Sequence, residues 1–352
     1  MNPGNWGCSR NRFRIKRMLM KPIKHLGHRL LFVLLTSTVL VFFSEKVFWY
    51  IQGYSIVELI LFYAVPASVC LWVINTFQVQ RLSSLVLVGG LFGFLVEGIL
   101  TPVLYEGGLL DPVMPAYFIS WHGTLSLVLG WYFIRLCLVE GHWKRTLLAS
   151  MAIGLFWGAW SLVYRLPESI KEFQGLTEAG ESFLPGAWPV SDFALYTLIF
   201  TGMLAAAHWL LGKGIWQRAF PLKKWEIILL GGILILLYLA QVFPVVPLGF
   251  LKLTCGVILV LIPMRMVQIR TEKTSILKLL DSHFQAIQLA PLLTLPLFAS
   301  LVYLLADIFP PSEELLRGAY IGTYTLQSFF GGGIFIWAWA DSIKIWRGKT
   351  RV

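Results

Sequence analysis

Two ionisable residues, Glu97 and His122, lie within long apolar stretches of the sequence. A charged side chain at the centre of a bilayer costs at least ~2.5 kcal/mol, so such residues usually face the bundle interior or an aqueous cavity. A carboxylate and an imidazole in contact favour each other's charged forms, which eases the burial of both. We therefore expect Glu97 and His122 to form one polar site that passes a proton or binds a cation. The plainer alternative is a pair that only fixes the helix register.

The expected helices bring these two side chains to a similar depth. Glu97 lies eight residues before the end of its helix, and His122 lies six residues after the start of the next. At 1.5 Å per residue, these positions are about 12 Å and about 9 Å below the outer membrane boundary. The connection Glu106–Pro115 is short, so the two helices should be antiparallel neighbours. Gly98 and Gly123, each next to one of the pair, would let the backbones come close.

Glu58 and Lys252 are further candidates for this polar site. Both lie near the outer ends of their expected helices, where long side chains can reach the headgroups instead. Glu106 and Asp111 stand in the loop between the helices of the pair and are expected to form an acidic outer vestibule. His208 should lie at a membrane interface. No spacing of Cys, His, Asp or Glu in the sequence indicates a metal site, and no cofactor-binding motif is present.

The composition identifies the solvent that surrounds these residues. Of the 352 residues, 57% are hydrophobic and only 13% are charged. A soluble globular domain carries about 25% charged residues. Polar loops must hold most of the charge here, which leaves long apolar segments for a bilayer. The chain is therefore expected to be an all-α, polytopic transmembrane helical bundle.

Apolar runs of about 20 residues, the length that spans a bilayer, give about ten spans. The first may continue past Glu45 and Lys46. Pro244 and Pro247 separate the seventh from the eighth. The expected spans are 30–44, 55–77, 83–105, 116–139, 146–165, 191–211, 225–243, 248–267, 289–309 and 318–341.

The distribution of charge predicts the orientation of the bundle. If the N-terminus is cytoplasmic, basic residues dominate the loops on that side, and acidic residues dominate the loops on the other, as the positive-inside rule requires. Both termini are then cytoplasmic. The chain divides into a basic tail (1–29), a single transmembrane domain (30–343) and a second basic tail (344–352).

The net charge of +11 indicates anionic lipid headgroups as the partner at the inner face, rather than nucleic acid, because the basic residues lie in short clusters between apolar runs. A membrane-protein partner or a homo-oligomer stays open. The plasma (inner) membrane is the expected location. The Arg-rich start, which lacks acidic residues, leaves an organellar membrane as the alternative.

Two features of the sequence indicate how its helices pack. Apolar residues recur at helical spacing in Ser275–Ile287, which predicts an amphipathic helix lying along the inner face. Gly89 and Gly93 form a GxxxG spacing, and Gly331–Gly333 is a glycine run within the last span. Both favour close approach of helices.

One short motif is excluded by its spacing. Glu313–Gly318 reads EELLRG and resembles the EExxxRG signature of intramembrane glutamic proteases. It is one residue short, which turns the arginine by about 100° on a helix. No histidine follows His283 to complete such a site. A charged helix start is the better interpretation.

Three classes of function remain. The first, which ten spans with few hydrophilic loops favour slightly, is a transporter or permease for a small solute, ion or lipid. The second is a membrane-embedded enzyme that acts on a lipid or isoprenoid substrate. The third is a non-catalytic subunit or assembly factor of a membrane complex.

Overall fold

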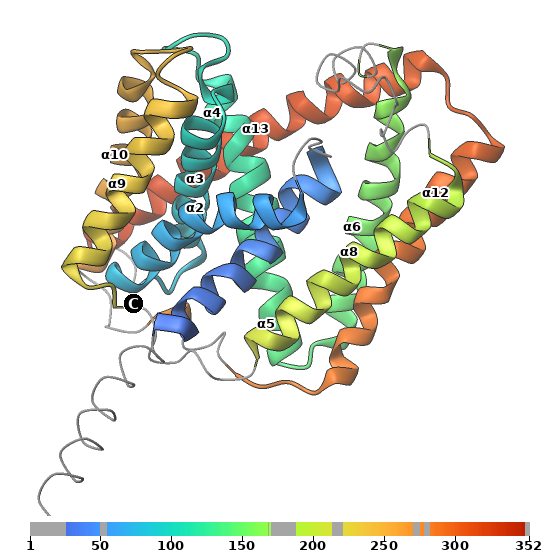
Figure 1. Ribbon diagram of the computed structural model, residues 1–352, viewed down its shortest axis with the longest axis horizontal. Helices are drawn as coiled ribbons and strands as arrows, with labels where there is room; N and C mark the ends of the chain where they lie inside the picture. The colour runs from blue at the N-terminus through green and yellow to red at the C-terminus, as the bar shows by residue number, and fades with distance from the viewer. Residues whose placement is uncertain are drawn as a thin grey trace, which may run out of the picture.

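The long apolar runs of the sequence form helices in the computed structural model, which describes residues 26–49, 55–167, 169, 188–212, 221–269, 275–277 and 282–348. Within these residues every regular element is helical. Figure 1 shows the helices packed side by side as a bundle. The polytopic all-α bundle expected from the sequence is therefore confirmed.

The first half of the chain supplies five long helices. The first helix begins at Leu26 and ends in the segment η1 (Phe42–Trp49). The remaining elements of this half are α2 (Ile56–Thr76), α3 (Leu82–Leu95) with η2 (Val96–Leu100), η3 (Val103–Tyr105), α4 (Val113–Phe118) with η4 (Ile119–Phe133) and α5 (Ile134–Val139), and α6 (Trp143–Ser161) with η5 (Leu162–Arg165).

The second half supplies five more. They are α8 (Val190–Leu211), α9 (Lys224–Gln241), α10 (Gly249–Gln268), η7 (Ala286–Leu293) continuing as α12 (Thr294–Ile308), and α13 (Glu313–Trp346). Each of the ten expected helices is thus present in the described chain, with ends that differ by a few residues. The first helix does continue past Glu45 and Lys46.

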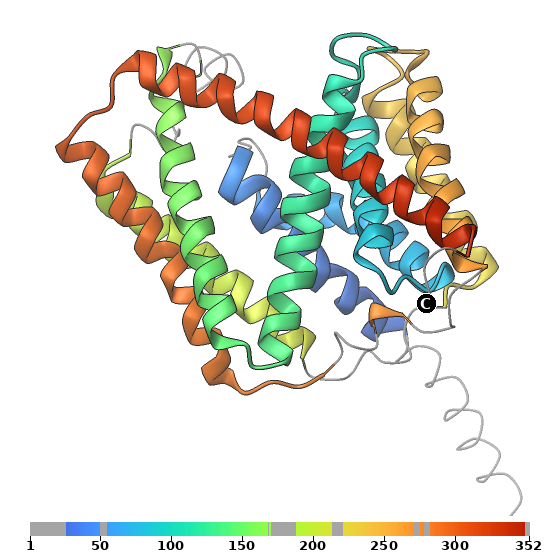
Figure 2. The ribbon, with the colours of Figure 1, turned by 180° about the vertical axis from the view of Figure 1, so that it is seen from behind.

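Nine of these described helices are long and apolar enough to cross a membrane. The exception is α13, which contains no stretch as apolar and as poor in charged residues as those of the other nine helices. Its 34 residues extend about 51 Å, well beyond the ~30 Å hydrocarbon core. Figure 2 shows α13 crossing the back of the bundle diagonally. That α13 is a tenth span stays a prediction.

The helices alternate between two ends of the bundle. The loop that follows η3 and the turn between α9 and α10 lie at the upper end in Figure 1, whereas the first helix begins and α13 ends at the lower end. We call the upper end, which carries Glu106 and Asp111, the outer end. The two ends of the described chain thus share the inner end, while the side that faces the cytoplasm stays a prediction.

Glycines set the closest crossings. Gly89 on α3 packs against Gly123 on η4, and the Gly93 position meets the Phe118 carbonyl oxygen. A side chain on Gly331 would overlap the carbonyl oxygen of Ala116, so α13 crosses α4 in backbone contact. The GxxxG spacing and the glycine run therefore do permit close approach, as predicted.

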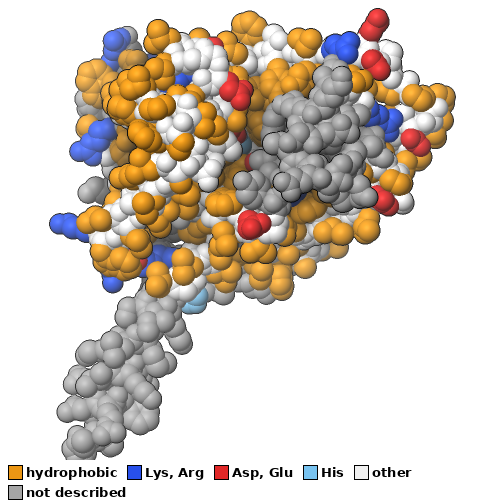
Figure 3. All heavy atoms as spheres, turned by 45° about the horizontal axis from the view of Figure 1, so that its top comes forward, with side chains coloured by type: hydrophobic (Ala, Val, Ile, Leu, Met, Phe, Trp, Pro, Cys, Tyr) orange, Lys and Arg blue, Asp and Glu red, His pale blue; other side chains and the backbone are white. Residues whose placement is uncertain are grey.

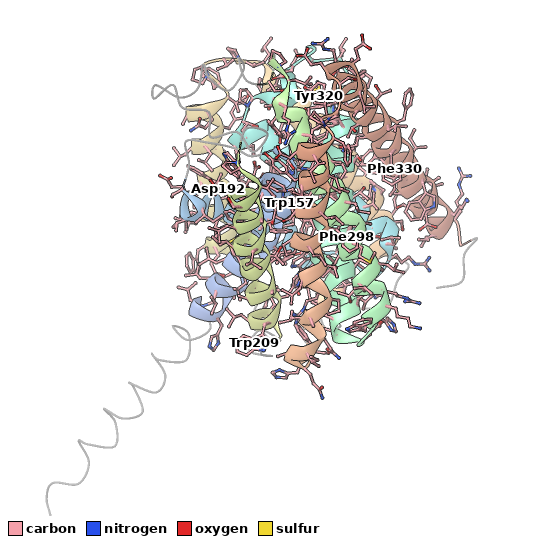
Figure 4. All side chains as sticks on the ribbon, turned by 90° about the vertical axis from the view of Figure 1, so that its right-hand side faces the viewer. Trp157, Asp192, Trp209, Phe298, Tyr320 and Phe330 are labelled. Carbon is pink, nitrogen blue, oxygen red and sulfur yellow. The ribbon has the colours of Figure 1, made fainter. Side chains whose placement is uncertain are left out.

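Hydrophobic residues dominate the surface as well as the core. No residue of α9 is buried, and Ile228 and Leu236 are among its exposed apolar side chains. In Figure 3 hydrophobic side chains cover much of the described surface. Figure 4 shows Asp192 and Trp209 toward opposite ends of α8, with Trp157 in the interior. A bilayer, rather than water, matches such a surface.

The prediction of one amphipathic helix over Ser275–Ile287 is wrong for residues 282–285. Residues 282–285 are not helical, and Gln285 has an extended backbone that precedes η7. The physical reason is that η7 begins at Ala286 and leads directly into α12. Ala286 and Ile287 therefore belong to the next long helix rather than to a helix along the inner face. Lys278, Leu280 and Asp281 lie outside the described residues.

The two expected tails, 1–29 and 344–352, are described only in part. Within the described residues, helix is present from Leu26 and as far as Trp346, so residues 26–29 and 344–346 are helical. Residues 1–25 and 349–352 lie outside the described residues, as does most of the expected outer loop 166–190.

Candidate functional site

Three π-helical segments each carry an ionisable residue of the bundle interior. They are η1, η2 and η4, which hold Glu45, Glu97 and His122 respectively. π-Helical turns are rare and occur frequently at functional sites, because the wider turn redirects side chains. The three segments lie on different helices, so the polar residues meet only through tertiary packing.

Glu97 and His122 are in direct contact. The Nε2 atom of His122 lies 2.6 Å from Oε1 of Glu97. Both residues are buried. The contact that the sequence analysis expected between these two residues is therefore present.

Their positions differ from expectation in one respect. The helix of Glu97 ends at Leu100 rather than at Tyr105, because Tyr105 folds back and donates a hydrogen bond from its hydroxyl to the carbonyl oxygen of Gly98 at 2.8 Å. Glu97 thus lies about one turn, not two, from its helix end.

Hydroxyl groups extend this pair into a chain of hydrogen bonds. Ser44 Oγ lies 3.0 Å from Nδ1 of His122, and Ser126 Oγ lies 2.9 Å from Ser44 Oγ. Thr101 donates to the second carboxylate oxygen of Glu97 at 2.8 Å. Both ring nitrogens of His122 and both oxygens of Glu97 are thereby engaged.

This chain can accommodate His122 with one proton or with two. When the imidazole is neutral, Nε2–H donates to Glu97 and the Ser44 hydroxyl donates to Nδ1. When the imidazole is charged, Nδ1–H donates to Ser44 instead. Ser44 then donates to Ser126, which itself donates to the carbonyl oxygen of Trp121 at 3.3 Å. Rotation of hydroxyl hydrogens alone converts one pattern into the other.

A second carboxylate, Glu45, borders the same site. The Tyr63 hydroxyl donates to Oε1 of Glu45. Oε2 of Glu45 is buried and has no hydrogen-bond partner among the described residues. Glu45 itself is 2% exposed.

Both carboxylates line one cavity, which we call the carboxylate cavity. Its volume is ≈ 90 Å³. A polar site holds one water when it offers roughly 10–15 Å³, so this cavity has room for several waters or a small cation. The residues that line it are Glu45, Leu59, Phe62, Tyr63, Val96, Glu97, Leu100, Thr101, Val103, Leu237 and Gln241.

Aromatic rings enclose the imidazole. The indole ring of Trp121 stacks on His122 with centroids 4.7 Å apart, and Phe92 meets it edge-on at 5.7 Å. This packing keeps the surroundings of the Glu97–His122 contact apolar, where an electrostatic interaction is stronger than in water.

Lys46 adds a positive charge beside Glu45. Its Nζ atom lies 5.2 Å from the ring centroid of Phe200 on α8. The ammonium group interacts electrostatically with the carboxylate of Glu45.

The other expected members of the polar site do not join it. Glu58 is exposed and forms a capping box with Ser55 at the start of α2. Lys252 donates to the carbonyl oxygen of Gly108 at 2.8 Å. Glu58 accepts from a free backbone N–H group at the start of its helix, whereas Lys252 binds a loop carbonyl oxygen near the start of α10.

The expected acidic vestibule is not part of the cavity either. Neither Glu106 nor Asp111 is among the residues that line the carboxylate cavity. Asp111 instead accepts hydrogen bonds from the backbone N–H groups of Val113 and Met114, at the start of α4.

Sequence reasoning also assigned two packing roles incorrectly. Gly123 does allow close approach, but its partner is Gly89, whereas a side chain at Gly98 would meet Leu104 and Leu253. His208, expected at an interface, is fully buried. The guanidinium of Arg135 donates to the His208 carbonyl oxygen, which draws this part of α8 into the bundle.

Four residues at the site are not among the candidates that the sequence indicates. The first expected span ends at Ser44, Glu45 and Lys46 interrupt it, and Tyr63 is not distinguished from other aromatic residues. One signal was available: Glu45 and Lys46 interrupt an apolar run, and residues that remain inside such a run must be buried with partners.

No protein-family model matches the chain, and comparisons with curated proteins and with solved structures find no match.

Proposed function

We propose that the protein is a transporter that moves protons across the membrane, with Glu97 and His122 as its proton-binding site. The observation that carries this proposal is the buried 2.6 Å contact between the two side chains at the edge of the carboxylate cavity. Intramembrane ionisable residues that pair in this way mark proton relays in pumps and transporters.

The hydrogen-bond chain supplies the chemistry. A proton that enters the carboxylate cavity is accepted by Glu97. When the neutral imidazole carries its hydrogen on Nδ1, that N–H donates to Ser44 and Ser44 donates to Ser126. Nε2 then takes the proton from Glu97, which leaves a carboxylate and an imidazolium in contact. The site thus stores or releases a proton without displacement of heavy atoms.

A second candidate is a membrane-embedded serine hydrolase. Ser44, His122 and Glu97 form a hydrogen-bonded series of nucleophile, base and acid, as acyl-transfer enzymes require. However, Ser44 is fully buried and is not among the residues that line the carboxylate cavity. The Ser44 hydroxyl is thus enclosed by the described residues, which favours proton transport over attack on a lipid carbonyl.

The test uses the purified chain in liposomes with a pH-sensitive dye inside. We expect a pH gradient to dissipate faster with the wild-type protein than in empty liposomes, in media that contain Na⁺ on both sides. Glu97→Gln keeps the shape and the hydrogen-bonding capacity but removes the proton-binding carboxylate, and should abolish the flux.

Glu58→Gln is the matched control, because it removes a carboxylate from the outer end without touching the cavity, and it should retain wild-type flux. If the wild type moves no protons in any medium, or if folded Glu97→Gln is fully active, the transport proposal is wrong. Labelling of Ser44 by a serine-reactive fluorophosphonate would support the hydrolase instead.

A further inference from the structure

We infer that the carboxylate cavity binds one small monovalent cation between Glu45 and Glu97, and that this cation is exchanged for the transported proton. The inference deepens the proposed function and rests on it. It assigns a role to Glu45, which the proton relay does not use.

The first observation is the bare oxygen of Glu45. Oε1 receives the Tyr63 hydroxyl, but Oε2 has no hydrogen-bond partner within the described chain although the residue is 2% exposed. Buried polar atoms are nearly always satisfied, and an exception needs a cause such as a bound ion. Glu45 is one of the residues that line the carboxylate cavity, so its carboxylate stands in the cavity wall.

The second observation is the set of oxygen donors around the cavity. Glu45, Tyr63, Glu97, Thr101 and Gln241 all line it, and each bears a side-chain oxygen. Carboxylate, hydroxyl and carbonyl oxygens suit hard cations rather than soft ones. A volume of ≈ 90 Å³ admits such an ion with part of its water shell, whereas drug-sized ligands need about 300 Å³ or more.

The charge balance selects a monovalent ion. Among the described residues, the ionisable side chains at this site are Glu45, Lys46, Tyr63, Glu97 and His122. When both carboxylates are ionised, Lys46 is charged, and His122 and Tyr63 are neutral, the site carries one net negative charge. Burial without a partner at Oε2 disfavours the ionised form of Glu45, and a positive charge in the carboxylate cavity would offset that cost.

One positive charge neutralises the site in either of two ways. A proton on His122 does so through the relay, and a monovalent cation in the carboxylate cavity does so directly. Binding of one therefore disfavours binding of the other, since a second positive charge would be buried without compensation. Competition of this kind is what an exchanger requires.

The test measures binding of ²²Na⁺ to the detergent-purified chain, separately from flux. Wild-type protein should bind Na⁺ and should release protons into a weakly buffered solution when Na⁺ is added. Glu45→Gln should weaken Na⁺ binding by at least about tenfold, since it removes a charged ligand. Glu58→Gln should leave binding unchanged.

Several results would overturn the cation site. They are wild-type protein that neither binds Na⁺ nor releases protons when Na⁺ is added, binding that is unaffected by Glu45→Gln, and preference for Mg²⁺ or Ca²⁺ over Na⁺. The proton-release measurement on wild type decides the question if Glu45→Gln does not fold. Proton flux that depends on Glu97 but not on Na⁺ would overturn the cation site and leave the proposed proton transport intact.

Discussion

The backbones of Gly89 on α3 and Gly123 on η4 are in contact, and Gly123 directly follows His122 of the polar site in the sequence. A Cβ atom placed on Gly89 would lie 2.5 Å from Cα of Gly123. This crossing brings α3 and η4 together and so sets the distance between Glu97 and His122.

Gly89→Ala is therefore expected to destabilise the protein by ~1–3 kcal/mol, the usual cost of overpacking. The loss should appear as a lower midpoint of thermal unfolding in detergent. Gly202→Ala is the control, because nothing lies within 4 Å of its added Cβ. Equal midpoints for the two variants would show that the crossing is not close.

The glycine run in α13 offers an internal comparison. A side chain at Gly331 would overlap the Ala116 carbonyl oxygen, whereas Gly333 has open space around it. Gly331→Ala should lower the unfolding midpoint, while Gly333→Ala should be neutral or raise it, since alanine favours helices by roughly 1 kcal/mol. The reverse order would contradict the crossing of α13 over α4.

Ser44→Ala tests the relay independently of the carboxylates. It leaves Nδ1 of His122 without its hydroxyl partner, so protonated His122 loses an acceptor. We expect proton flux in liposomes to fall about tenfold, the rate equivalent of one hydrogen bond to a charged group. Ser68→Ala, which removes a hydroxyl that bonds only to the Ala64 carbonyl oxygen, should keep normal flux. Normal flux in Ser44→Ala would exclude Ser44 from the relay.

Orientation can be measured by cysteine labelling in a variant that lacks the native cysteines. Leu110 is 97% exposed at the outer end, and Lys144 is exposed at the inner end. With the positive-inside orientation, Leu110→Cys should react with an impermeant maleimide added to intact cells, and Lys144→Cys only after permeabilisation. The opposite pattern would reverse the orientation.

Much of the fold follows from local features of the sequence. Hydropathy over windows of about 20 residues located the spanning helices, because a helix needs that length to cross the hydrocarbon. The short loop after Glu97 made its helix and that of His122 antiparallel neighbours. Similar depth on adjacent helices made contact between the two side chains possible, provided that both face the same way.

The sequence did not predict which residues form the polar site. Ser44, Glu45 and Tyr63 lie on helices that are apolar all round, and such helices have no polar face from which their rotation can be read. Glu58 and Lys252 looked equivalent to Glu97 in sequence, yet they serve helix ends and a loop carbonyl.

The amino-acid sequence by itself therefore determined which segments form long apolar helices, and that two neighbouring helices each carry an ionisable group. Tertiary packing decided which groups share a cavity. Glycine contacts such as that between Gly89 and Gly123 set how closely α3 and η4 approach, and the π-helical turns aim Glu45, Glu97 and His122 inward. Both depend on contacts between segments far apart in the chain, which hydropathy and spacing along one helix do not encode.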